Sequence, residues 1–165
     1  MQGNHRLLLK NIKQLVQVTD SKQPFKRMQE CSDLAIKEGY SLAVGADGNI
    51  LRIAKSEHID AEFKEANFDQ VIDCSKYCVI PGYVDAHTHA VFYGDRSHEY
   101  DMKLNGMGYA DIYNAGLGIR FTTNSVAQST VEELAAHLDR YLRRMSRLGT
   151  TTVEIKSGYG LNAEN

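Results

Sequence analysis

The apolar positions of the first eighty residues lie in short runs that predict strands rather than helices. Each run is rich in β-branched or other apolar side chains, and polar or glycine-containing segments separate the runs. Between two of them stands Asp47-Gly48, a pair typical of hairpins because glycine tolerates a positive φ. Apolar residues at helical spacing predict one short surface helix over 56–67. Residues 1–80 are therefore expected to form a small β-rich, sandwich-like domain. The predicted strands cover 7–10, 15–18, 41–44, 50–54, 71–73 and 77–80.

The pattern changes at Pro81-Gly82, which we interpret as a domain boundary that assigns 81–165 to a second domain. The clearest helix of the chain is expected over 130–148, where apolar side chains recur on one face. A β-branched run over 150–156 follows it directly. Helix, glycine and strand in this order are typical of βα repeats, so the second domain predicts an α/β fold with a parallel sheet.

Both ends of the 130–148 helix carry recognisable signals. Thr130 and Glu133 have the spacing of a capping box, and Gly149 stands where a residue of positive φ commonly ends a helix. His137 falls on the polar side of this helix, which we expect to face solvent. A shorter helix is predicted over 109–115.

The composition is typical of a globular protein, with 42% hydrophobic and 24% charged residues. Nineteen basic residues against 21 acidic ones give a net charge of −2, and the basic residues are scattered, so we expect no nucleic-acid partner. No apolar run approaches the ~20 residues of a membrane helix, and the start of the chain lacks the apolar core of a secretory signal. These features predict a cytoplasmic protein without a membrane partner.

The three cysteines agree with this compartment. Cys31, Cys74 and Cys78 are odd in number and irregularly spaced, which predicts reduced thiols rather than a disulfide framework. No second Cys/His pair at zinc-ribbon spacing accompanies Cys74 and Cys78, so thiols in or beside a strand are favoured over a metal site.

The most distinctive chemistry lies in His87-Thr88-His89. Alternate residues of a strand point to the same side, so two imidazoles in this spacing can bind one ion, and imidazole suits zinc and iron alike. A chance pair on a solvated strand is the alternative. The carboxyl ends of parallel strands meet at one edge of a sheet, so Tyr159, in the loop after the next long strand, is expected on the same face as this pair.

Three longer segments carry a resemblance to a known family. The strings PGYVDAHTHAVFYGDR (81–96), KLNGMGYADI (103–112) and GTTTVEIKSGYGL (149–161) resemble the imidazolonepropionases among the metal-dependent amidohydrolases. The similarity extends from about Leu7 to Leu161 and is strongest from Pro81 onward. It implies a TIM-type (β/α)8 barrel preceded by the small β-rich domain, and a soluble enzyme that binds one divalent metal ion, zinc or iron.

The resemblance also assigns roles to matching residues. His87 and His89 match the first two metal ligands, Arg96 matches the arginine that meets the substrate carboxylate, and Tyr159 matches a substrate-binding tyrosine. Without the family, Arg96 reads equally as a solvated surface charge. The alternative for Tyr159 is a side chain that only packs over the barrel mouth. No catalytic acid or base is expected within this chain. Gly116-Leu117-Gly118 departs from the family's unbroken glycine triplet, which bears on the local loop shape.

The implied activity is hydrolytic opening of the ring of 4-imidazolone-5-propanoate to N-formimidoyl-L-glutamate in histidine degradation. A (β/α)8 barrel takes ~250 residues, far more than follow Pro81, so we expect an incomplete barrel, with its further catalytic groups beyond Asn165, that is inactive alone. Two alternatives stay open: a non-catalytic truncated product that acts through a binding partner, or another cyclic amidohydrolase or aminohydrolase. The expected ligand is a small molecule with a carboxylate; the sequence leaves a homo-oligomer open.

Overall fold

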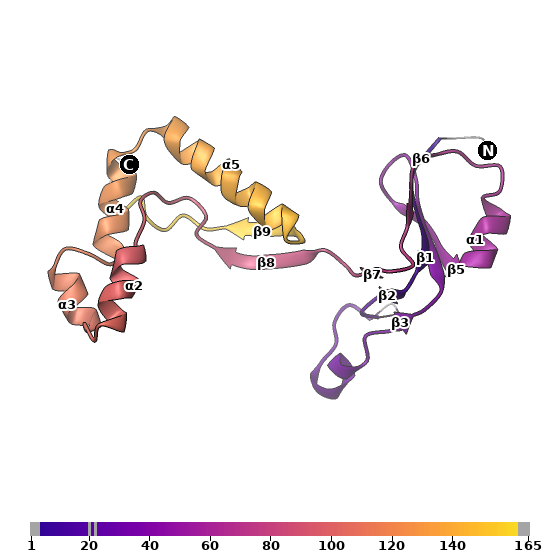
Figure 1. Ribbon diagram of the computed structural model, residues 1–165, viewed down its shortest axis with the longest axis horizontal. Helices are drawn as coiled ribbons and strands as arrows, with labels where there is room; N and C mark the ends of the chain where they lie inside the picture. The colour runs from indigo at the N-terminus through magenta and orange to yellow at the C-terminus, as the bar shows by residue number, and fades with distance from the viewer. Residues whose placement is uncertain (1–3, 20, 22, 162–165) are drawn as a thin grey trace. The chain divides into compact units, whose positions relative to one another are not determined.

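The computed structural model describes residues 4–19, 21 and 23–161, and the chain forms two compact units, Met1–Pro81 and Gly82–Asn165 (Figure 1). Both sheets of the first unit are mixed, and the second unit pairs parallel strands with helices, so the fold is α/β. The described residues form no closed barrel.

The first unit contains two small sheets with strand orders β5-β4-β1-β6 and β3-β2-β7. In each, the strand nearest the start of the chain pairs antiparallel on one side and parallel on the other. The predicted hairpin is confirmed as β4 and β5, with Gly48 in its turn at a φ of +84°. The strands are β1 (His5–Ile12), β2 (Gln14–Val16), β3 (Ile36–Lys37), β4 (Tyr40–Val44), β5 (Ile50–Lys55), β6 (Phe68–Asp73) and β7 (Cys78–Val79).

The core of the first unit lies on the two faces of β1 and β4. On one face, Ile59 of α1 (Ser56–Glu62) is fully buried with Leu8 and Ala43. The predicted helix over 56–67 is therefore confirmed but shorter. A 3-10 helix, η1 (Met28–Ser32), lies between β2 and β3. The other face buries Ile12, Leu15, Leu42 and Cys74.

All three cysteines are free thiols, as predicted. Burial raises the pKa of the Cys74 thiol, with a smaller contribution from the neighbouring Asp73 carboxylate, so this thiol stays protonated. Cys31 and Cys78 are exposed.

The second unit is built on a parallel pair, β8 (Tyr83–Thr88) and β9 (Thr150–Ile155), with four helices between them in sequence. Figure 1 shows α5 lying along these two strands, while α2, α3 and α4 gather near their carboxyl ends. The helices are α2 (Ser97–Leu104), α3 (Tyr109–Asn114), α4 (Ile119–Gln128) and α5 (Val131–Arg147). None of the helices that the structure describes has the length and apolar character needed to cross a bilayer.

Helix α5 begins and ends as its sequence predicts. The Thr130 hydroxyl accepts a hydrogen bond from Glu133 N at 3.2 Å, and Thr130 N donates to Glu133 Oε2 at 2.9 Å. Gly149 follows the helix at a φ of +99°. These local signals fix where the helix stops and therefore where β9 starts beside β8.

The prediction for His137 is wrong. Its side chain is half-buried, and its ring centroid lies 4.8 Å from those of Phe92 and Tyr141. The side of α5 that the apolar pattern marks as polar thus packs an imidazole against aromatic rings. Burial lowers the pKa of His137, and the nearby Arg140 charge lowers it further.

Candidate functional site

The carboxyl ends of β8 and β9 meet at one edge, which brings the predicted histidine pair close to Tyr159. Lys156 N donates to the Thr88 carbonyl at 2.8 Å, so the strand pairing continues to the last residue before His89. The loop after β9 then passes beside that histidine, with the ring centroids of His89 and Tyr159 5.9 Å apart. The expectation that these residues share a face is confirmed.

His87 and His89 converge at their Nε2 atoms, which lie 3.3 Å apart. Two imidazole nitrogens bound to one tetrahedral zinc at about 2.0–2.1 Å would be separated by about 3.3 Å. The pair therefore fits a single metal ion as two adjacent ligands. Among the residues that the structure describes, no group of three or more His, Cys, Asp or Glu side chains is placed to hold a metal.

The position of His89 depends on Gly158. Nδ1 of His89 is buried and has no hydrogen-bond partner among the described residues. A Cβ at position 158 would lie 2.3 Å from this nitrogen and 3.0 Å from two carbons of the ring. The glycine in the Lys-Ser-Gly-Tyr-Gly segment thus leaves the space that the imidazole occupies.

Arg96 and Tyr159 share a cavity of about 190 Å³ with His89. Three of the four site residues predicted from the sequence therefore line one cavity. The fourth, His87, is not in the lining, but its Nε2 lies 3.3 Å from Nε2 of His89. Phe92 contributes an aromatic wall. The lining residues are His89, Phe92, Gly94, Arg96, Thr122 and Tyr159.

A second, larger hollow of about 710 Å³ adjoins this cavity. Phe92, Gly94 and Arg96 line both spaces, and the larger one also includes His137 and Tyr141. The two spaces therefore meet at these three residues.

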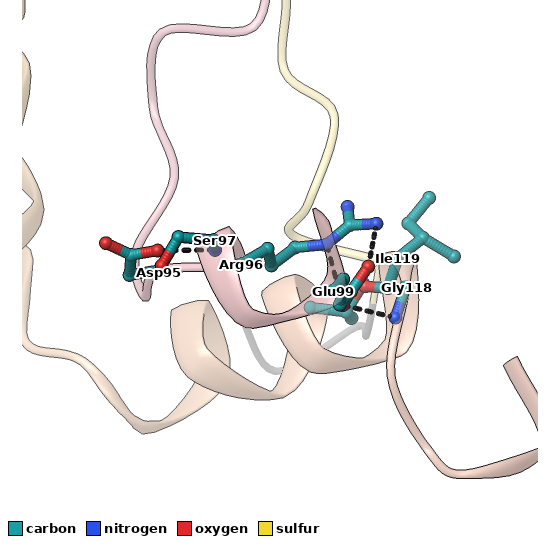
Figure 2. Close-up of polar contacts among 7 residues, drawn as sticks. Asp95, Arg96, Ser97, Glu99, Gly118 and Ile119 are labelled. Atoms are coloured by element: carbon teal, nitrogen blue, oxygen red, sulfur yellow. Dashed lines mark hydrogen bonds and ion pairs between the residues drawn. The ribbon is translucent and has the colours of Figure 1, made fainter. Parts of the chain in front are cut away.

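Glu99 is a buried charged residue of the site that the sequence pattern did not single out. Its carboxylate accepts hydrogen bonds from Arg96 Nε at 2.9 Å, from Arg96 Nη2 at 2.7 Å and from Gly118 N at 2.7 Å (Figure 2). Its side chain is 3% exposed. The spacing of Arg96 and Glu99, three residues apart at the start of α2, is the one signal that could have identified the pair.

Leu117 does not disturb the loop before α4. The residues at positive φ are its two neighbours, Gly116 at +80° and Gly118 at +72°. Leu117 N donates to the Ile112 carbonyl at 3.2 Å. The side chain thus occupies the one position of the segment where a Cβ costs no backbone strain.

The Arg96–Glu99 pair should make stability depend on pH. The hydrogen bonds from Arg96 hold the pKa of the Glu99 carboxyl below its ordinary value of 4.5, and the Gly118 N–H adds to this, against the effect of burial. A carboxyl whose pKa is lower in the folded than in the unfolded state stabilises the fold at pH values above its unfolded-state pKa. This stabilisation is lost as the pH falls through the folded-state pKa. As the pH falls below the ordinary value of 4.5 and through the lower folded-state pKa, the free energy of unfolding should therefore fall more steeply in the wild type than in Glu99→Gln.

Urea unfolding at a series of pH values measures this difference. Comparing the two proteins at each pH cancels the contributions of the other carboxyls, including Asp47, Asp73 and Asp95, whose pKa values are also lowered by hydrogen bonds. Identical pH dependence in the two proteins would show that Glu99 contributes nothing to acid unfolding.

Comparisons with known proteins give a consistent result. The chain is 48% identical over 164 residues to a probable imidazolonepropionase of Bos taurus and 46% identical over 164 residues to that of Homo sapiens. Each alignment covers 99% of this chain and 38% of the relative. A probable imidazolonepropionase of Dictyostelium discoideum is 42% identical over 159 residues, which cover 96% of this chain and 37% of the relative. A search of protein-family models finds no match.

The matches to the bovine and human relatives cover almost all of this chain. The chain spans a little more than a third of the length of the relatives it matches. The resemblance found in the sequence motifs is confirmed: over almost its whole length, the chain is similar to proteins named probable imidazolonepropionase.

Proposed function

We propose that this chain contributes a metal- and substrate-binding part to an imidazolonepropionase, a hydrolase that opens the ring of 4-imidazolone-5-propanoate with water to give N-formimidoyl-L-glutamate. The observation that carries the proposal is the cavity that His89, Arg96 and Tyr159 line together. Next to it, His87 Nε2 lies 3.3 Å from His89 Nε2. The similarity to proteins named probable imidazolonepropionase supports the reaction.

His87 and His89 would hold one zinc or iron ion through Nε2. When bound, such an ion would polarise the ring carbonyl and make water a better nucleophile at neutral pH. The chain itself keeps the two nitrogens at ligand spacing, because β8 aligns them and Gly158 leaves room for the second ring. In the proposed enzyme, the remaining ligands and the proton-transfer groups would come from the segments of an imidazolonepropionase that this sequence does not span.

Arg96 would bind the propanoate carboxylate. Its planar guanidinium is suited to two parallel hydrogen bonds with a carboxylate, and its side chain is 37% exposed where it lines the cavity. Tyr159 lines the same cavity, with its ring centroid 5.9 Å from that of His89, and would offer a ring and a hydroxyl to the imidazolone. An arginine in this cavity favours a carboxylate-bearing ring over a neutral cyclic amide.

The architecture around the site follows from the same proposal. The parallel β8–β9 pair with α5 along it would be the first part of a TIM-type barrel, and the two mixed sheets of the first unit would form the small sandwich-like domain. We also propose that residues 1–80 and 81–165 are the two corresponding domains.

A chimera tests the function. This chain would replace the matching part of the bovine relative, and the product would be loaded with zinc or iron and assayed for ring opening. The wild-type chimera should turn over 4-imidazolone-5-propanoate, and Arg96→Met should raise the KM at least about tenfold because a charge-assisted, bidentate contact is lost.

The carboxamide of the substrate is the matched control. Its turnover should change little in Arg96→Met, since it lacks the charge that Arg96 binds. An unchanged KM for the carboxylate substrate would contradict the role of Arg96. A folded, metal-loaded chimera without ring opening would contradict the proposed reaction.

A further inference from the structure

The Glu99 carboxylate has a complete set of partners that are all within the protein. Two are nitrogens of Arg96 and the third is the backbone N–H of Gly118, 19 residues further along the chain. The side chain is 3% exposed, and it does not line the cavity that Arg96 and Tyr159 share. Glu99 therefore has no direct access to a ligand in that cavity.

Glu99 holds Arg96 by one edge of its guanidinium, and among the described residues no hydrogen bond is made by Nη1 of Arg96. Its guanidinium carries five N–H groups, and the contacts with Glu99 use one on Nε and one on Nη2. The other N–H groups belong to Nη1 and Nη2, and Figure 2 shows one terminal nitrogen of Arg96 without a dashed line. This second edge has the geometry that binds a carboxylate with two parallel hydrogen bonds.

We propose that Glu99 is a positioning residue: it holds Arg96 by the Nε–Nη2 edge and so presents the Nη1–Nη2 edge to the substrate carboxylate. The inference rests on the proposed function, because it takes Arg96 as the partner of that carboxylate. Glu99 acts through Arg96 and touches no substrate atom.

Net charge cannot be what Glu99 contributes. Its negative charge neutralises Arg96, so a purely Coulombic site for an anion would be better without it. What the pair provides is a fixed side chain: a free arginine loses rotamer freedom when it binds a ligand, and a side chain already fixed before binding does not lose that freedom again. The two effects therefore predict opposite results when the charge of Glu99 is removed.

Gly118 completes the arrangement. Its backbone has a φ of +72° and a ψ of −142°, a region essentially restricted to glycine, and this conformation aims its N–H at Glu99 Oε1. The glycine segment before α4 thus supplies the third hydrogen bond that holds the Glu99 carboxylate.

The experiment uses the 165-residue chain and follows the Nε–Hε signal of Arg96 by NMR. The signal is assigned by its loss in Arg96→Lys. The probes are 3-(imidazol-4-yl)propanoate and its carboxamide. The carboxylate should shift the signal saturably in the wild type and the carboxamide should not. In Glu99→Gln, the Kd for the carboxylate should rise about tenfold or more, although the site has gained positive charge.

Asp139→Asn is the matched control, because Asp139 accepts a hydrogen bond from Arg143 Nε at 2.7 Å on the exposed surface of α5. It removes the carboxylate partner of another arginine and should leave the Kd unchanged. Glu99→Asp is the second variant if Glu99→Gln fails to fold: it keeps the charge, moves the carboxylate away from Arg96, and should also raise the Kd. Backbone spectra confirm folding.

Equal or tighter binding of the carboxylate in a folded Glu99 variant would overturn the positioning role and leave Arg96 as the carboxylate site. A wild-type chain that does not respond to the carboxylate would overturn the role of Arg96 in the proposed function, and the positioning role with it. The two failures are therefore distinguishable.

Discussion

Replacing Gly158 by alanine is expected to lower the zinc affinity of the His87–His89 pair about 10- to 100-fold, the range seen when groups that orient a metal ligand are changed. The added Cβ would lie 2.3 Å from Nδ1 of His89 and 3.0 Å from Cε1 and Cγ. These are ring atoms next to a fixed strand, so the imidazole has to move. The 3.3 Å spacing of the two Nε2 atoms is then lost.

Zinc titration followed by the ring Cε1–H signals of both histidines measures this effect. The exposed thiols of Cys31 and Cys78 would compete for zinc, so both proteins carry serine at these two positions. Gly108→Ala is the control, because the nearest atom to its added Cβ is a flexible carboxylate oxygen 3.2 Å away. Equal zinc affinity in Gly158→Ala and in Gly108→Ala would show that the imidazole of His89 has room to adjust.

The second large effect is expected for Gly82→Ala, at the start of β8. A Cβ there would lie 2.2 Å from Oγ1, 2.3 Å from Cγ2 and 2.7 Å from Cβ of Thr151 on β9. The clash includes a Cβ, which cannot rotate away, so the two strands must separate at this end. Overpacking of this kind typically costs about 1–3 kcal/mol, and we expect Gly82→Ala to lower the free energy of unfolding by about 2–3 kcal/mol.

A double-mutant cycle measured by urea unfolding tests the cause. Thr151→Gly alone should destabilise modestly, because it removes a β-branched residue from a strand. In the double variant, the cost of Gly82→Ala should largely disappear, because the atoms that it meets are gone. Additive free energies in the cycle would show that the clash with Thr151 is not the cause.

Local signals predicted the parts of the fold that depend on neighbours in sequence. The Asp47-Gly48 turn and the Thr130–Glu133 capping box are both present as expected, since each needs only a few adjacent residues. The histidine pair is likewise a local pattern, because strand alternation alone places both rings on one side.

The parts that the sequence did not predict depend on long-range packing. The N–H of Gly118 reaches Glu99 only because the chain folds back between α2 and α4, and no periodicity marks such a contact. His137 is polar by type and was placed in solvent, but Phe92, which lies far from it in sequence, covers its ring. The contact of Gly158 with His89 also joins two segments that the helices α2 to α5 separate in sequence.

The parallel pairing of β8 with β9 has a consequence for the order of folding. The two strands can pair only after a loop containing four helices has closed, and closing a long loop costs entropy before any strand contact compensates for it. The helices are local and form early, whereas His87, His89 and Tyr159 are brought together only when that loop closes. We therefore expect the approach of Tyr159 to the histidine pair to be among the last features of the second unit to form during folding.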